Sequence, residues 1–259
     1  MLVSLVIPAY NEEARLGSSL ERVASYLASR PYKSETIVVD DGSKDHTAKI
    51  VAEYFLKFES QGLSLRLLKN PGNRGKGYSI RNGVLNASGD VVLFTDADLS
   101  APITEIDRLI EPIVEDRFDL VFGSRGLETS VISTHQSIFR ETAGRTFNLM
   151  MRILTGLNFK DTQCGFKAFN RKRCKSVFEL QRINGFGFDV EVLYIAKKHK
   201  LRLLEMPVTW GHVEGSKVGI ATGAKTFVDL ATVRWHDICG RYSFRAIASK
   251  TAVVSTHQR

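Results

Sequence analysis

Two aspartates separated by a single residue, Asp96 and Asp98, carry the clearest chemical signal in this 259-residue sequence. They follow an apolar run at 91–95, and Ala97 lies between them. Two such carboxylates at a strand end can converge on one divalent cation, and oxygen ligands suit Mg²⁺ or Mn²⁺, which often bind one or two carboxylates plus substrate phosphates. A bound cation would stabilise a departing diphosphate, because a unit charge ~4 Å away contributes about 4 kcal/mol at an effective dielectric of about 20. The alternative is that both aspartates only cap the next helix.

A second acidic pair, Asp40 and Asp41, follows another β-branched run and leads into Gly42 and Ser43. A turn of this composition exposes its carboxylates, which makes the pair a candidate for contact with a nucleotide-linked substrate. A plain turn before a helix capped by Asp45 would produce the same pattern, so the pair is only moderately specific when taken alone.

The third group is Pro8, Ala9, Tyr10, Asn11 and Glu12, where a proline ends a β-branched run and polar residues begin a helix. Tyr10 is a candidate to pack against a nucleobase, and Glu12 is a candidate to accept hydrogen bonds from that base. Glu12 would also stabilise a helix N-terminus through its negative charge, and the two roles can coexist.

All three groups follow predicted strands of an α/β fold. Over the first 125 residues, short β-branched runs alternate with longer amphipathic stretches, which is the rhythm of βαβ units on a parallel sheet. The predicted strands are 2–8, 35–39, 63–68, 91–95 and 120–122, and the predicted helices are 11–29, 45–60, 76–86 and 104–116, the last with Thr104 and Asp107 in capping-box spacing. Ligands of such sheets bind outside the carboxyl ends of the strands, so the acidic groups should share one edge.

The second half of the chain has a different rhythm but no clear linker. We expect a helix at 137–155, a glycine-rich segment at 162–169, a helix near 190–198, a short strand at 201–205 and a helix at 227–238. The sequence therefore predicts one domain at 1–242, with a nucleotide-binding half at 1–125 and an acceptor-binding half at 126–242. Residues 243–259 are expected to form a C-terminal tail.

Composition limits the class of protein. A formal net charge of +8, from 36 Lys and Arg against 28 Asp and Glu, favours an anionic partner such as phosphate or acidic lipid, and no recognised nucleic-acid module is visible. Three cysteines without CxxC spacing favour a reducing cytosol over a disulfide framework or a zinc site. No apolar run reaches the roughly 18 to 20 residues that span a bilayer, and we expect neither secretion nor membrane spanning.

The motifs PAYNEE, DDGS and TDADLS, in this order and spacing, resemble those of family 2 glycosyltransferases with the GT-A fold. DTQCGF at 161–166, GFGFDVE at 185–191 and EGSK at 214–217 are similar to the polyprenyl-phosphate sugar synthases, and most similar to the dolichyl-phosphate glucosyltransferases among them. The resemblance covers about residues 2–241. The sequence departs from the mannosyl members at Ser100, where glutamine is common, and at Thr209, where asparagine is common.

The resemblance implies a role for each matching residue. Donor contacts are expected at Pro8, Ala9, Tyr10, Glu12, Asp40, Asp41, Lys76, Asp96, Ala97 and Lys217, with Asp96 and Asp98 also holding Mg²⁺ or Mn²⁺. Beyond the resemblance, the residue types and their positions lead us to expect direct roles in transfer for Asp98, Arg125 and Asp189, and acceptor contacts for Arg140, Arg145 and Ser216. Guanidinium groups grip phosphate bidentately, although Arg140 and Arg145 would serve equally well as solvated residues of a helix face.

Two further segments have an open interpretation. The loop GNRGKG at 72–77 lacks P-loop spacing; its Arg74 and Lys76 could face a donor diphosphate, although a simple entry to the next helix also explains it. The segment 137–159 mixes apolar residues with arginines, which is compatible with an interfacial membrane helix as well as with ordinary core packing.

The predicted reaction is a single, inverting displacement that moves a hexose, most simply glucose from UDP-glucose rather than a GDP-sugar, onto a polyprenyl phosphate at the cytosolic face of a membrane. A lipid phosphate is already anionic at neutral pH, so no strong general base is needed. One alternative is transfer to a sugar or protein hydroxyl, which needs a base such as Asp189 or Glu191. Another is a nucleotide-sugar-binding module without catalysis. Self-association and a membrane-protein partner are left open.

Overall fold

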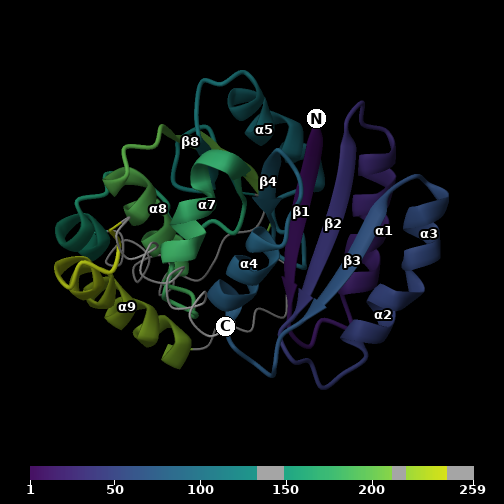
Figure 1. Ribbon diagram of the computed structural model, residues 1–259, viewed down its shortest axis with the longest axis horizontal. Coiled ribbons are helices and arrows are strands. Elements are labelled where there is room, and N and C mark those ends of the chain that lie inside the picture. Colours follow the sequence, from purple (N-terminus) through teal and green to yellow (C-terminus); the bar gives the residue numbers. More distant parts are fainter. Residues whose placement is uncertain (133–148, 212–219, 244–259) are drawn as a thin grey trace, which may run out of the picture.

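The computed structural model describes residues 1–132, 149–211 and 220–243, and its centre is a seven-stranded sheet with the strand order β3-β2-β1-β4-β7-β5-β8 (Figure 1). The strands are β1 Leu2–Ala9, β2 Lys33–Asp40, β3 Ser64–Lys69, β4 Val91–Phe94, β5 Leu120–Ser124, β7 Lys167–Asn170 and β8 Leu203–Pro207. A separate pair joins β6 Val131–Ile132 to β9 Thr209–Trp210 in parallel. The five strands predicted in the first half are all present.

Helices cover both faces of the sheet (Figure 1). They are α1 Leu16–Ala28, α2 Thr47–Glu53, α3 Phe55–Ser60, α4 Lys76–Leu85, α5 Ile106–Val114, α7 Arg171–Leu180, α8 Phe188–Lys198 and α9 Ile220–Ile238, with a 3-10 turn at Ile103–Glu105 before α5. Residues of β1 alternate between two apolar clusters: Val6 belongs to the cluster that also contains residues of α4, α7, α8 and α9, whereas Leu5 and Ile7 belong to the cluster that contains residues of α1 and α5. Both faces of the central strands are therefore buried, as expected for a parallel sheet.

Strand β7 is the main feature that the sequence did not predict. It lies antiparallel between β4 and β5. Ala168 of β7 lies opposite Leu93 of β4 on one side and opposite Val121 of β5 on the other. The segment 162–169 was expected to be a glycine-rich loop, and the prediction was wrong over its last residues because four strand residues are too few to show a period. The strand comes from the second half of the chain, so both halves share one sheet.

Several predicted helix boundaries also need correction. The helix expected at 45–60 is two helices that meet at Tyr54, and the one expected from residue 11 begins at Leu16 because Asn11 adopts a left-handed φ of 53°. The predicted capping box is absent: no side chain caps α5, and the Asp107 carboxylate instead accepts hydrogen bonds from Tyr32 at 2.7 Å and Arg30 at 2.8 Å. Helix α7 was not expected.

The second half contains the predicted helices near 190–198 and 227–238, as α8 and as the C-terminal part of α9. Of the helix expected at 137–155, the structure describes a helical run at 149–155. No helix in the part of the chain that the structure describes is both long and apolar enough to cross a bilayer.

Candidate active site

The three acidic groups predicted from the sequence do meet at one edge of the sheet. Ala9 and Asp40 are register partners at the ends of β1 and β2, and β4 ends at Phe94, two residues before Asp96. Strands β2, β1 and β4 are neighbours and run in parallel, so their carboxyl ends lie together at the lower edge in Figure 1. We call this the carboxyl edge.

Asp96 lies at the centre of the carboxyl edge, and its side chain is 36% exposed. One carboxylate oxygen lies 2.5 Å from the Lys76 ammonium, at the first residue of α4. The chain passes the other side of Asp96 at Gly165, where an added Cβ would lie 2.2 Å from a carboxylate oxygen. Asp96 therefore has room only because residue 165 has no side chain.

Asp98 is held by its own turn. Its Oδ1 accepts hydrogen bonds from the Ser100 amide at 3.0 Å and hydroxyl at 2.8 Å, while its Oδ2 lies 3.4 Å from the Arg15 guanidinium. Ser100 thus orients Asp98 through its backbone amide and its hydroxyl, and only the hydroxyl contact would be lost with glutamine at this position.

The metal prediction can be judged by the donor set. Within residues 1–132, 149–211 and 220–243, no group of three or more His, Cys, Asp and Glu side chains forms a potential ligand cluster. Two aspartate carboxylates with open coordination positions do match Mg²⁺ or Mn²⁺ sites completed by substrate phosphates and water. The residues at hand fit a cation that arrives with its diphosphate, and not a site made by protein side chains alone.

Glu12 and its neighbours form one wall of the site. The Glu12 carboxylate is 8% exposed and accepts hydrogen bonds from the Arg15 guanidinium at 2.8 and 2.9 Å, and its amide donates to Thr47 at 2.7 Å. Pro8 and Tyr10 are half-buried beside it, whereas Ala9 and Ala97 are buried. Arg15 thus bridges Glu12 and Asp98, a link that sequence reasoning missed, although an arginine three residues after Glu12 is a recognisable i,i+3 pair.

Asp40 and Asp41 have different partners. Asp40 accepts a hydrogen bond from the Ser43 amide at 2.9 Å and closes the turn after β2. Asp41 accepts from the Asn70 side chain at 2.7 Å and from the amides of Arg74 at 3.0 Å and Gly75 at 2.7 Å. The carboxylate of Asp41 therefore shapes the loop that leads to Lys76.

Lys167, at the start of β7, was not expected from the sequence and lies at the floor of the site. Its side chain is completely buried, and its ammonium forms an ion pair with Asp189 of α8 and donates to the Cys164 carbonyl at 2.7 Å. Burial raises the pKa of Asp189, with the Lys167 and Lys76 ammonium groups opposing that shift. A lysine within the otherwise apolar run FKAF at 166–169 was the available signal.

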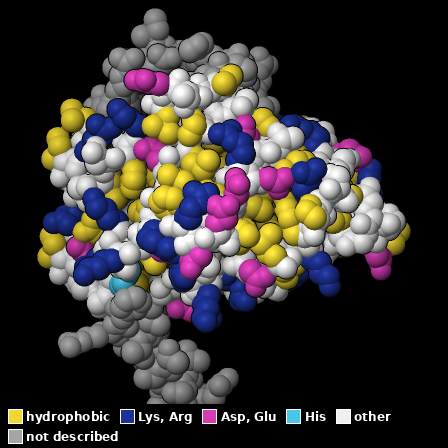
Figure 2. All heavy atoms as spheres, turned by 90° about the horizontal axis from the view of Figure 1, so that it is seen from above, with side chains coloured by type: hydrophobic (Ala, Val, Ile, Leu, Met, Phe, Trp, Pro, Cys, Tyr) yellow, Lys and Arg dark blue, Asp and Glu magenta, His cyan; other side chains and the backbone are white. Residues whose placement is uncertain are grey.

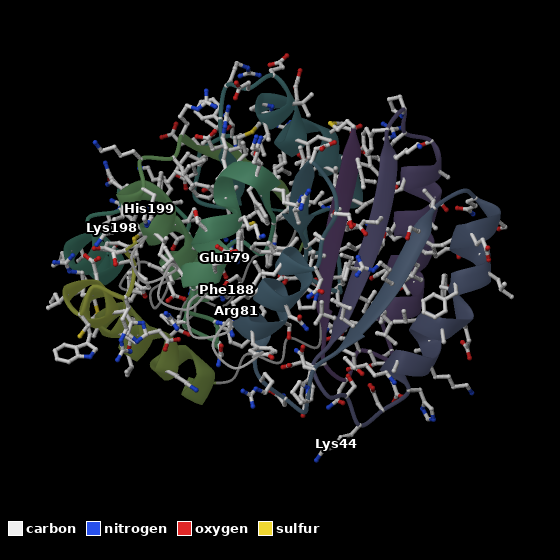
Figure 3. The ribbon with its side chains drawn as sticks, in the orientation of Figure 1. Lys44, Arg81, Glu179, Phe188, Lys198 and His199 are labelled. Atoms are coloured by element: carbon white, nitrogen blue, oxygen red, sulfur yellow. The ribbon has the colours of Figure 1, made fainter. Side chains whose placement is uncertain are left out.

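Helix α8 carries two acids with separate environments. Asp189 faces the carboxyl edge through Lys167, whereas the fully buried Glu191 accepts from the amides of Arg182 at 2.9 Å and Ile183 at 2.8 Å and from the Tyr242 hydroxyl at 2.6 Å. Phe188 lies at the start of the helix, next to α4 and Arg81 (Figure 3). Glu191 is occupied by the chain that it anchors, so it is unsuited to the alternative role of a general base.

Arg125 follows β5 and is bound to Asp161 of the DTQCGF motif. Its guanidinium donates two hydrogen bonds to the carboxylate, at 2.6 and 3.0 Å, and stacks 5.5 Å from the Trp210 ring centroid. Burial raises the pKa of Asp161, but Arg125 more than reverses this and lowers it to about 2. Burial raises the pKa of the neighbouring Cys164 thiol to about 12, so the thiol is protonated at neutral pH.

Four predicted contact residues, Arg140, Arg145, Ser216 and Lys217, lie outside the described residues. The predicted site residues that the structure does describe fall into two neighbouring groups: the donor-side residues on the ends of β1, β2 and β4, and Arg125 with Asp189 on the ends of β5 and the start of α8. Lys76 connects the groups, since both Asp96 and Asp189 raise its pKa against the effect of burial.

A mostly parallel sheet covered on both faces, with an Asp-x-Asp turn at its carboxyl edge, defines the class of α/β nucleotide-sugar transferases with the GT-A fold. The model of the glycosyl transferase family 2 matches residues 4–178, and the chain belongs to this family of glycosyltransferases.

Relatives of known name support a narrower grouping. The chain is 38% identical over 240 residues to a dolichyl-phosphate beta-glucosyltransferase of Trichomonas vaginalis, covering 89% of this chain and 72% of that protein. It is 35% identical over 227 residues to the dolichyl-phosphate beta-glucosyltransferase of Homo sapiens, covering 83% and 69%. Among solved structures, glucosyl-3-phosphoglycerate synthase from Mycobacterium tuberculosis, in complex with Mn²⁺, UDP and phosphoglyceric acid, matches with a TM-score of 0.67 at 19% identity, over 93% of this chain and 78% of that one.

Proposed function

We propose that this glycosyltransferase moves glucose from UDP-glucose to a polyprenyl phosphate such as dolichyl phosphate, with inversion at the anomeric carbon. The observation that carries the proposal is the meeting of Asp40, Asp96 and Asp98 at one sheet edge, in a chain whose named relatives are dolichyl-phosphate beta-glucosyltransferases. Pro8, Tyr10, Glu12 and Asp40 would contact the nucleoside from the ends of β1 and β2.

Asp96 and Asp98 would hold Mg²⁺ or Mn²⁺, which when bound neutralises charge on the diphosphate. Ser100 and Arg15 hold Asp98 in position, and the Lys76 ammonium lies beside Asp96 as a further positive charge for the diphosphate. Asp41 acts indirectly, because its carboxylate holds the loop from which Lys76 extends.

The environment of Asp189 favours a phosphate acceptor over a hydroxyl acceptor. A general base must reach the proton that it removes, but Asp189 is 3% exposed and tied to a buried lysine. A lipid phosphate has a second pKa of roughly 6 and is a competent nucleophile without a base. Arg125, held by two hydrogen bonds to Asp161, would bind the acceptor phosphate together with Arg140, Arg145 and Ser216, and Lys217 would contact the donor.

The test is a transfer reaction with purified full-length protein, MnCl₂ or MgCl₂, and dolichyl phosphate in detergent micelles. UDP-glucose, UDP-N-acetylglucosamine and GDP-mannose are offered separately, and the lipid product is identified by mass and its anomer by NMR. We expect a β-linked glucosyl phosphate lipid from UDP-glucose. Transfer to hydroxyl acceptors without any glycolipid would instead support the second reaction, and an α-linked product would overturn inversion.

Contact with a membrane surface is part of the same proposal, since the acceptor is a lipid. Exposed apolar side chains lie on the helical run at 149–155 and on α9, at the side of the molecule away from α3 (Figure 1). Ile153 is 73% exposed, Trp235 61% and Ile238 72%, and positively charged Arg152 and Arg234 lie among them. Apolar side chains mixed with arginines suit an interface with acidic lipid headgroups.

Replacing Ile153 and Trp235 together by serine should lower binding to vesicles of acidic phospholipid about 30-fold, because burying each apolar side chain in the bilayer contributes on the order of 1 kcal/mol. Co-sedimentation measures the bound fraction. Leu56→Ser is the matched control, since Leu56 is 79% exposed on α3 at the other end of the molecule. An equal loss in both proteins would contradict a specific docking side.

A further inference from the structure

Both carboxylates of the Asp-x-Asp turn are already paired with positive side chains in this structure. The Lys76 ammonium lies 2.5 Å from Asp96, and the Arg15 guanidinium lies 3.4 Å from Asp98. Arg15 is held mainly by Glu12, at 2.7 Å, so its contact with Asp98 is secondary. The ion pair between Lys76 and Asp96 is therefore the main one at the expected cation position.

The start of α4 is closely packed around Lys76, and this packing explains two glycines of the GNRGKG loop. Gly75, directly before α4, has a φ of 100°, and a Cβ there would lie 2.4 Å from the Asn184 carbonyl oxygen. A Cβ at Gly77 would lie 2.5 Å from the Ile183 carbonyl oxygen. The chain at 183–184 thus packs against the start of α4 on both sides of Lys76, so rotation of the Lys76 side chain is the simplest way for its ammonium to change partner.

The charges around Lys76 give it a choice of partners. The Lys76 ammonium contacts the Asp96 carboxylate directly, and the Asp189 carboxylate is near enough to interact with its charge. Asp189 is already paired with Lys167, which leaves Asp96 as the main anion for Lys76 in the donor-free protein. A diphosphate entering at Asp96 would offer the same ammonium a stronger anion, because a charged phosphate accepts short, strong hydrogen bonds.

We propose that Lys76 occupies the place of the divalent cation on Asp96 until the nucleotide diphosphate arrives, and then turns to the diphosphate. This role rests on the proposed function and adds the order in which Lys76 contacts Asp96 and then the diphosphate. A cation alone competes with the Lys76 ammonium for Asp96, whereas a cation with UDP does not, because UDP supplies the ammonium with a new partner. Cation and nucleotide therefore bind cooperatively, and each strengthens the other by the same factor.

The experiment is a titration with MnCl₂, followed by calorimetry or by the EPR signal of free Mn²⁺, with and without UDP. In the wild-type protein we expect UDP to tighten Mn²⁺ binding about tenfold, within the roughly 5- to 150-fold range of coupling between sites. Lys76→Gln should bind Mn²⁺ alone about tenfold more tightly than wild type, and UDP should then add little. The matched control is Lys44→Gln, which removes a lysine that extends into solvent from the same edge (Figure 3) and should behave as wild type.

Lys76→Arg keeps the charge and guards against a folding artefact. It should retain weak Mn²⁺ binding in the absence of UDP, whereas a change caused by disturbed packing would appear in both Lys76 variants. Equal or weaker Mn²⁺ binding by Lys76→Gln, relative to wild type, would overturn the role. If Lys76→Gln fails to bind Mn²⁺ more tightly but the wild type transfers glucose, the role of Lys76 is wrong and the proposed function stands. If Lys76→Gln binds Mn²⁺ more tightly but the wild type transfers no glucose, the role of Lys76 stands and the proposed function is wrong.

Discussion

The two ends of the central sheet gather similar numbers of charged side chains and use them differently. At the amino edge, Asp116 and Asp119 share Arg173 and Arg202, with Asp119 lying 2.6 Å from the first guanidinium and 2.8 Å from the second. Figure 2 looks onto this edge and shows acidic and basic side chains intermixed over it. At the carboxyl edge, Asp96 has one lysine partner and a partly open carboxylate.

The difference lies in how replaceable each partner is. A guanidinium holds a carboxylate through a planar fork, whereas an ammonium is a point charge that can change partner. At the amino edge, burial raises the pKa of Asp119, but hydrogen bonds from Arg202 and Arg173 reverse this and hold the pKa far below its ordinary value. The amino edge therefore locks its charges to stabilise the fold, and the carboxyl edge keeps its charges exchangeable for ligands.

The largest effect expected from this comparison is on catalysis. Asp98→Asn should lower kcat/KM for glucosyl transfer about 10²- to 10³-fold, because it removes negative charge from the pair that holds the cation against the diphosphate. Its thermal unfolding should stay close to that of wild type. Asp116→Asn, at the amino edge, is the counterpart and should leave kcat/KM unchanged. A similar decrease in kcat/KM in both variants would contradict the claim that only the carboxyl edge serves catalysis.

The next effect concerns the buried ion pair below the carboxyl edge. Lys167→Met leaves the Asp189 carboxylate in the interior without its main partner and should lower the free energy of unfolding by about 3–5 kcal/mol, measured by urea denaturation. Adding Asp189→Leu should restore most of that stability, since a buried pair replaced by apolar groups is often neutral. A single variant as stable as wild type would mean that Lys76 alone compensates Asp189.

The smallest effect is at the amino edge and depends on pH. Asp119→Asn should lower the free energy of unfolding by about 1.5–3 kcal/mol at pH 7, the value of hydrogen bonds to a charged group. The pKa of Asp119 is lowered in the folded state, so its stabilisation is complete above the unfolded-state pKa of about 3.9 and is lost as pH falls toward the folded-state pKa. Urea titrations at pH 7, 5 and 3.5 should show the same difference in free energy of unfolding between wild type and Asp119→Asn at pH 7 and 5, and a smaller difference at pH 3.5.

The sequence predicted the first half of the fold and the donor side of the site well, because these rest on local patterns. β-branched runs followed by Asp40 and by Asp96 are visible without knowledge of any distant contact. The sequence did not predict β7, which pairs with strands of the first half, or the Lys167–Asp189 pair, whose partners are 22 residues apart in the chain. It also left GNRGKG open between a loop that faces a diphosphate and a simple helix entry, since the carbonyls that demand its glycines come from residues 183 and 184.

Strand β7 has a consequence for how the enzyme can move. It is hydrogen-bonded to β4 on one side and to β5 on the other, so swinging the halves apart as rigid bodies would tear the middle of the sheet. A hinge motion that separates the two halves is therefore incompatible with the intact sheet. Discrimination among donors has to come from rotation of side chains and adjustment of loops at the edge of a sheet that keeps its shape. A fragment that ends before β7 would leave the hydrogen-bonding groups on one edge of β4 unpaired.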